Sequence, residues 1–137
     1  MKPHSTNYIN TFIEVAEDCP ASTGEVPPTK GDKKSVANYQ FELLERSPYK
    51  FDSDALLFLI FATRKSIDEA QWESERQAFF SKGQPCLRAS PLTKRYGWGV
   101  HSDEKGRIAI FGVESKEYKK FVADPSLKKV KAMKTKR

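Results

Sequence analysis

The sequence predicts an α+β domain in which a small antiparallel sheet, built from an N-terminal strand and a C-terminal β-hairpin, packs against three to four helices. Three observations support this fold class. Apolar and polar residues alternate around residues 8–15, which is the period of a strand. Between residues 32 and 83, apolar residues recur every three or four positions, which is typical of helices. Two further alternating arms lie between residues 95 and 114 and predict a hairpin.

The first expected element is a strand in "YINTFIEVAEDC". Ile9, Thr11 and Ile13 fall on one side of this stretch, and Tyr8 and Phe12 fall on the other. The segment "PASTGEVPPTKGD" follows it and is rich in Pro, Gly, Ser and Thr, so we expect a long surface loop. This loop is the best candidate for a mobile lid.

A first helix is expected after Asp32, which is a suitable N-cap residue. The run ends at Ser47-Pro48, because proline disfavours helical backbone in the residue before it. The positions that repeat at helical spacing are Val36, Tyr39, Gln40, Leu43 and Leu44.

A second helix is expected to start at Asp52 or Ser53. Its apolar stretch "ALLFLIFA" has acids before it and Arg64 and Lys65 after it, the order that the helix dipole favours. A buried strand is the alternative for so short an apolar run.

A third helix is expected from a capping box formed by Ser66 and Glu69, with Gly83 as the C′ glycine. Its shared face carries Trp72, Arg76, Phe79 and Phe80.

The C-terminal part of the chain begins with a short helix that Ser115 caps and that stops near Asp124-Pro125. Beyond it, Leu127, Val130 and Met133 have the spacing of one or two further amphipathic helical turns. We expect residues 1–126 to form a single α+β domain and residues 127–137 to form a basic tail.

The charge is concentrated at the C-terminal end. The formal net charge of the 137 residues is +6, but residues 116–137 alone carry +7, so the rest of the chain is close to neutral. Such a tail attracts nucleic acid or other polyanions, and it is also typical of a solvated terminus. No basic and apolar leader and no apolar run of membrane-spanning length is visible, so we expect a soluble, cytoplasmic protein with reduced thiols and no membrane partner.

The stretch "GQPCLRASPLTKRYGWGVH" is the most cationic part of the chain outside the tail and is the expected ligand-binding region. Arginine offers a planar fork of donors to phosphate or carboxylate, hydroxyls add further donors, and aromatic rings stack on bases. A polar loop that leads into a hairpin is the alternative. The candidate ligand-binding residues are Arg88, Ser90, Thr93, Lys94, Arg95, Tyr96, Trp98 and His101.

Two glycines in the first arm of the hairpin leave one face of that strand bare. Gly97 and Gly99 alternate with Tyr96 and Trp98, so something must approach the backbone closely on the glycine side, in line with His101. The candidates are a packed helix, another side chain, or a ligand.

The candidate catalytic residues are His101, as acid or base, and Cys86, as a nucleophile. The chain shows no Walker loop, no dinucleotide-binding glycine motif and no zinc-binding spacing, so we expect no cofactor and no metal.

Three blocks of the sequence resemble a family of small, uncharacterised microbial proteins classed as a domain of unknown function. They are "HSTNYINTFIEVAEDCP", "KGDKKSVANYQFELL" and "FFSKGQPCLRASPLTKRYGWGVHSDEKGRIAIFGVESKEY". The resemblance covers nearly the whole chain and implies a single domain of intracellular type. It transfers no catalytic or binding residue, because the family has no established activity.

The function expected first is that of a binding module for an anionic, phosphate-bearing ligand or nucleic acid. A small enzyme that uses His101 with Cys86 or a loop hydroxyl is a second candidate, and a protein-interaction scaffold is a third. A homodimer formed through the hairpin edge is a further expectation, because a three-stranded sheet leaves edges to cover.

Overall fold

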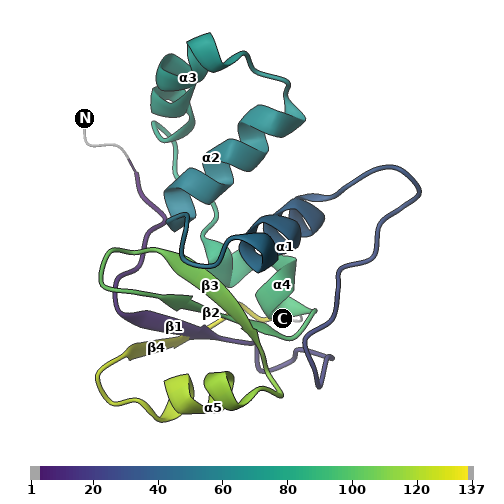
Figure 1. Ribbon diagram of the computed structural model, residues 1–137, viewed down its shortest axis with the longest axis vertical. Coiled ribbons are helices and arrows are strands. Elements are labelled where there is room, and N and C mark those ends of the chain that lie inside the picture. The colour runs from purple at the N-terminus through teal and green to yellow at the C-terminus, as the bar shows by residue number, and fades with distance from the viewer. Residues whose placement is uncertain (1–3, 136–137) are drawn as a thin grey trace.

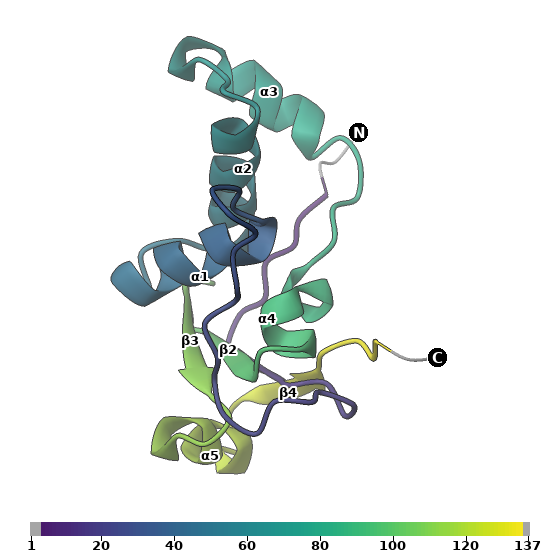
Figure 2. The same cartoon turned by 90° about the vertical axis from the view of Figure 1, so that its right-hand side faces the viewer.

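The computed structural model describes residues 4–135 and has an α+β fold around one four-stranded mixed sheet (Figure 1). The strand order is β3-β2-β1-β4. Figure 2 shows α1 and α4 on one side of this sheet and α5 on the other, while α2 and α3 extend away from it. The strands are β1 (Thr11–Glu14), β2 (Trp98–Ser102), β3 (Ile108–Gly112) and β4 (Lys128–Lys131). The helices are α1 (Val36–Arg46), α2 (Ser53–Arg64), α3 (Trp72–Phe79), α4 (Pro91–Lys94) and α5 (Lys116–Ala123).

The predicted hairpin is confirmed as β2 and β3, which pair antiparallel from Trp98–Gly112 to Ser102–Ile108. Its turn is specified locally, because the Asp103 carboxylate accepts hydrogen bonds from the backbone of Lys105 and Arg107. Gly106 takes the left-handed conformation that this turn requires.

The sheet has a fourth strand where the sequence indicated more helix. The residues at helical spacing after Pro125 do not continue α5; Lys128–Lys131 instead forms β4 and pairs parallel to β1. The helical expectation failed because the open edge of β1 supplies backbone partners to this segment, and that pairing is invisible to local spacing. The sheet is therefore mixed rather than purely antiparallel, and four residues of the expected tail belong to it.

The first two helices form where they were predicted, with one change of cap. Helix α1 is capped by Ser35 rather than Asp32: the Ser35 hydroxyl accepts from the Asn38 backbone, and the Asn38 side chain accepts from the Ser35 backbone. Helix α2 is confirmed over the strand alternative, and the Asp52 carboxylate caps it by accepting from Ala55 N.

The predicted start and end of the third helix are wrong. Ser66 has a positive φ of 52° and cannot cap a helix there. The short 3-10 turn Glu69–Gln71 precedes α3, which begins only at Trp72. The helix ends at Phe79, and Gly83 lies beyond it without left-handed backbone. Helix α5 is as predicted, with Ser115 as its N-cap and Asp124 as its C-cap.

The main core lies between the sheet and the α1, α2 and α4 side. Ile13 of β1 and Val100 of β2 point into it and meet Leu44 of α1 and Leu56 of α2. A second, smaller cluster centres on Phe58, Ala62 and Phe80 and joins α2 to α3. Ile60 of the main core and Phe61 and Phe79, which pack against the second cluster, line one pocket.

The opposite face of the sheet is covered by α5. Phe12 of β1 contacts Tyr118 edge-on at a centroid distance of 4.9 Å and stacks on Phe121 at 5.2 Å. Gly99 of β2 makes room for this packing, since a Cβ there would lie 2.5 Å from Phe12 Cζ and 2.6 Å from Tyr118 Cε2. The bare strip at Gly99 is therefore filled by side chains of the protein itself.

Candidate functional site

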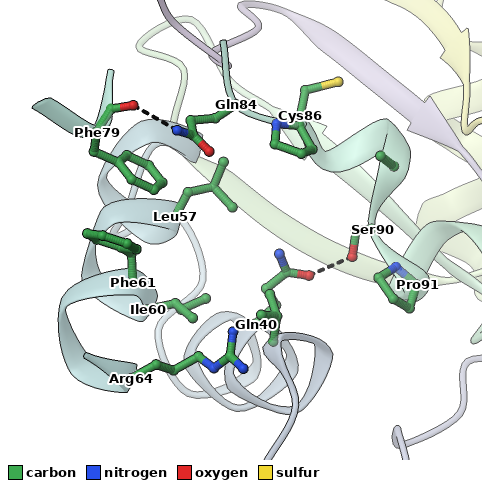
Figure 3. Close-up of a pocket in the computed structure, with 13 residues that line it drawn as sticks. Gln40, Leu57, Ile60, Phe61, Arg64, Phe79, Gln84, Cys86, Ser90 and Pro91 are labelled. Carbon is green, nitrogen blue, oxygen red and sulfur yellow. Dashed lines mark hydrogen bonds between the residues drawn. The ribbon is translucent and has the colours of Figure 1, made fainter. Parts of the chain in front are cut away.

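A pocket of about 280 Å³ lies between α1, α2, the end of α3 and the segment that runs from residue 84 to residue 91 (Figure 3). Its walls are mostly apolar, and a few polar side chains from separate elements line it. The apolar side chains are those of Val36, Leu57, Ile60, Phe61, Phe79, Pro85, Ala89 and Pro91, and the polar ones those of Gln40, Arg64, Gln84, Cys86 and Ser90.

Gln40 is the deepest polar residue of the pocket. It belongs to α1 and is only 3% exposed. Its Oε1 accepts a hydrogen bond of 2.5 Å from the Ser90 hydroxyl, whose oxygen in turn accepts from Leu92 N at the start of α4. Among residues 4–135 the Gln40 amide nitrogen has no hydrogen-bond partner. Figure 3 shows this nitrogen turned away from Ser90 and toward the pocket.

Gln84 contributes an acceptor from the opposite wall. Its Nε2 donates to Phe79 O at 2.7 Å, which fixes the orientation of the amide. Its Oε1 receives no hydrogen bond from the described part of the chain. The pocket therefore has one amide donor and one amide acceptor, supplied by different elements.

Arg64, the last residue of α2, contributes a positive charge to the pocket lining. Its side chain is exposed, and the ion pairs found within residues 4–135 do not include it. Figure 3 shows the guanidinium extending from α2 toward the side of the pocket on which Gln40 lies. An unpaired guanidinium beside an apolar pocket favours an anionic group.

The hydroxyls of the sequence-predicted stretch are used inside the protein. Thr93 is 0% exposed, and its Oγ1 hydrogen-bonds to Leu87 O at 2.9 Å and Ser90 O at 3.1 Å. Ser90 caps α4 and donates to Gln40. Both hydroxyls therefore fix the turn that forms one wall of the pocket.

The cations of this stretch do not line the pocket. Arg88 Nε donates to Lys131 O at 2.7 Å, and the Arg88 carbonyl accepts from Met133 N, so this residue holds the end of β4 in place. Lys94 is half-buried at the end of α4, and Arg95, the next residue, is exposed.

The aromatic residues Tyr96 and Trp98 anchor the long loop that precedes α1. The Tyr96 carbonyl accepts from Glu25 N, and Trp98 Nε1 donates to Glu25 O at 2.7 Å. The Trp98 ring packs over Gly24. Gly97 has a φ of 79° and lies against Thr23 O, so its lack of a side chain serves the same contact.

His101 lies on the α5 face of the sheet. Its ring stacks on Phe121 with centroids 4.2 Å apart, and a hydrogen bond of 2.8 Å joins its Nδ1 to Tyr49 Oη. Burial lowers the pKa of His101, and the carboxylates of Asp103 and Asp124 offset part of this effect.

Cys86 lies on the other side of the sheet from His101, on the side of α1, α2 and α4. Its sulfur is 3.7 Å from Tyr8 Oη, and burial raises the pKa of this phenol. Figure 3 shows the sulfur directed away from Gln40. Because Cys86 lines the pocket on the helical face and His101 stacks on α5, the structure does not bring the two residues together.

Sequence reasoning did not identify Gln40, Arg64 and Gln84 as site residues. The sequence places Gln40 among the positions of α1 that repeat at helical spacing, and a polar residue on that face is the signal available for it. The sequence indicates Arg64 only as a cation at a helix C-terminus, and Gln84 lies in the stretch 83–101 without being one of its candidate residues.

Two structural findings concern metals and membranes. Residues 4–135 hold no group of three or more His, Cys, Asp or Glu side chains placed to bind a metal ion. In the same range, no helix combines the length and apolar character needed to cross a bilayer.

Comparison with known proteins identifies the family. Neither the curated proteins nor the solved structures give a match. The model of a family of unknown function, DUF6157, matches residues 3–137, which is nearly the whole chain. The chain therefore belongs to the family of unknown function DUF6157.

Proposed function

We propose that this protein is a binding module for a small organic anion and that the ligand occupies the pocket between α1, α2 and residues 84–91. The observation that carries the proposal is the Gln40 amide nitrogen, which belongs to a buried residue, is directed into the pocket and is unpaired within residues 4–135. No side-chain nitrogen or oxygen of residues 4–135 is both buried and unpaired, so this nitrogen is open to the pocket. A ligand that brings an acceptor can therefore replace water on it.

The shape and charge of the pocket support the ligand class. A volume of about 280 Å³ is at the small end of the range for ligand pockets, which favours a compact molecule. The apolar walls favour a hydrocarbon or aromatic body. Arg64 is exposed and makes no ion pair with the described residues, which favours a carboxylate or phosphate.

This proposal keeps the anionic ligand expected from the sequence and moves its site. The stretch from residue 83 to residue 101 contributes a wall that includes Gln84, Cys86 and Ser90, but not the cation. The cation comes from α2 instead.

Thermal unfolding against a panel of organic carboxylates, sugar phosphates, nucleotides and short oligonucleotides tests the proposal. A ligand at about 100 times its Kd adds roughly 2.7 kcal/mol, which raises the Tm of a domain of this size by several degrees. We expect such a shift with at least one small anion, its loss in Arg64→Gln, and its retention in Arg95→Gln, which removes an exposed cation outside the pocket.

Two results would contradict the proposal. One is a panel in which no small anion raises the Tm. The other is a shift that Arg64→Gln leaves intact. A shift given only by oligonucleotides falls under the first result, because these are too large for the pocket.

A further inference from the structure

We infer that the ligand carries an N-acyl amino acid group with an apolar side chain, either as a free small molecule or as the C-terminal residue of a peptide. This inference rests on the proposed function and names the chemistry of the ligand. It starts from three polar groups of different character in one pocket: the Gln40 amide donor, the Gln84 amide acceptor and the Arg64 cation.

The two glutamines have fixed orientations, so their free atoms are defined. Ser90 holds the oxygen of Gln40, and the Phe79 carbonyl holds the nitrogen of Gln84. Within the described residues, the NH₂ group of Gln40 and the oxygen of Gln84 then have no partner. A secondary amide matches this pair, because it offers one carbonyl acceptor and one N–H donor.

Other anions leave part of the site unmatched. A simple carboxylic acid, once ionised, has only acceptors, so nothing in it donates to Gln84 Oε1. A phosphate dianion has the same deficiency. An acyl amino acid adds the amide donor and still presents a carboxylate to Arg64.

The walls select the side chain. Leu57, Phe61 and Phe79 are apolar and come from α2 and α3, so a leucine-like or phenylalanine-like side chain is buried against them. The volume of about 280 Å³ accommodates one such residue with a short acyl group rather than a longer chain.

Isothermal titration calorimetry with N-acetyl-L-leucine and N-acetyl-L-phenylalanine tests the inference. Two comparators remove one group each: N-acetyl-L-leucinamide lacks the carboxylate, and 4-methylpentanoate lacks the amide. We expect each comparator to bind about tenfold or more weakly than N-acetyl-L-leucine, because the leucinamide leaves Arg64 without a carboxylate and 4-methylpentanoate leaves both Gln40 and Gln84 unpaired.

Variants assign the contacts. Gln84→Met removes the acceptor while keeping an unbranched side chain. We expect this variant to weaken the binding of N-acetyl-L-leucine by about tenfold and to leave the affinity for 4-methylpentanoate unchanged. Arg64→Gln should weaken the binding of N-acetyl-L-leucine and of 4-methylpentanoate and leave the affinity for the leucinamide unchanged. Arg95→Gln serves as the control cation and should change none of them.

The outcomes separate the two proposals. If 4-methylpentanoate binds as tightly as N-acetyl-L-leucine and both depend on Arg64, the inference is overturned and the proposed function stands. If neither acetyl amino acid binds, the inference is overturned whatever the wider anion panel shows. Within a positive result, a tripeptide ending in leucine that binds more tightly than N-acetyl-L-leucine assigns the source as a peptide C-terminus, and weaker binding assigns it as a free molecule.

Discussion

The Ser90 hydroxyl donates to Gln40 Oε1 over 2.5 Å, and this contact turns the Gln40 amide nitrogen toward the pocket. The two residues are 50 positions apart in the chain. One hydrogen bond thus joins α1 to the N-cap of α4 and orients the group on which the proposed site depends.

A double-mutant cycle measures this contact. Gln40→Met should destabilise the protein by about 1–3 kcal/mol, because the buried Ser90 hydroxyl loses its acceptor. Ser90→Ala should cost about 0.5–2 kcal/mol, since α4 also loses its N-cap. The double variant should cost less than the sum of the two, with a coupling of at least about 0.5 kcal/mol in chemical denaturation. Strict additivity would show that the two side chains do not interact in solution.

Gly99 should not tolerate a side chain. A Cβ at this position meets Phe12 and Tyr118 at under 3 Å, so Gly99→Ala should destabilise the fold by about 1–3 kcal/mol through overpacking. Gly83→Ala is the matched control, because its Cβ would meet only His4 Nδ1 at 3.9 Å. Equal denaturation midpoints for the two variants would contradict the packing of α5 on β2.

His101 should make stability depend on pH near neutrality. Burial lowers the pKa of His101 from its ordinary 6.5, more than Asp103 and Asp124 raise it. The unfolded chain therefore binds a proton at higher pH than the folded one, and stability falls as the pH drops below about 6.5 toward the lowered folded pKa. Above about pH 6.5, the contribution of the neutral His101 side chain to the free energy of unfolding is fully present.

The Tm measured from pH 7.5 to pH 5.5 checks the sign. His101→Phe keeps a ring against Phe121 and should flatten the decrease at low pH, whereas His4→Gln removes an exposed imidazole and should leave the decrease unchanged. A steeper decrease in His101→Phe would mean that the folded state stabilises the charged imidazole.

Trp98 should control the opening of the long loop before α1. Trp98→Phe keeps an aromatic ring and removes the hydrogen bond to Glu25 O. Losing this hydrogen bond costs about 1 kcal/mol of local stability and raises the population of the open loop about fivefold. Trypsin should therefore cleave correspondingly faster at the exposed residues Lys30, Lys33 and Lys34.

Trp72→Phe is the control for this experiment, because its indole donates to Ile67 O near α3, away from the loop. The same cleavage rate in both variants would show that Trp98 does not restrain the loop.

The elements that sequence alone predicted correctly are those with local signals. Asp52 and Ser115 each accept from the backbone three residues ahead, and Asp103 forms its turn within four residues. Strand β4 has no such signal: it forms because β1 presents an open edge more than a hundred residues earlier. The same limit applies to Gly99, where the glycine predicted close approach but could not name Phe12 as its partner.

The candidate site could not be predicted from the sequence, because it too depends on contacts between residues far apart in the chain. Gln40 becomes a pocket donor only because Ser90, far along the chain, takes its oxygen. The hydroxyls and cations of residues 83–101 looked like a ligand site because their internal partners, such as Leu87 O for Thr93 and Lys131 O for Arg88, are fixed only by the folded structure.

The measurement that tests the central claim most directly is the side-chain amide spectrum of ¹⁵N-labelled protein, with the Gln40 signal assigned by Gln40→Met, during titration with N-acetyl-L-leucine. The account predicts that the Gln40 NH₂ resonances shift and exchange more slowly with water as the ligand binds, and that Arg64→Gln abolishes both changes. Resonances of Gln40 that stay unchanged while the ligand demonstrably binds would contradict it, because the ligand would then lie outside the pocket.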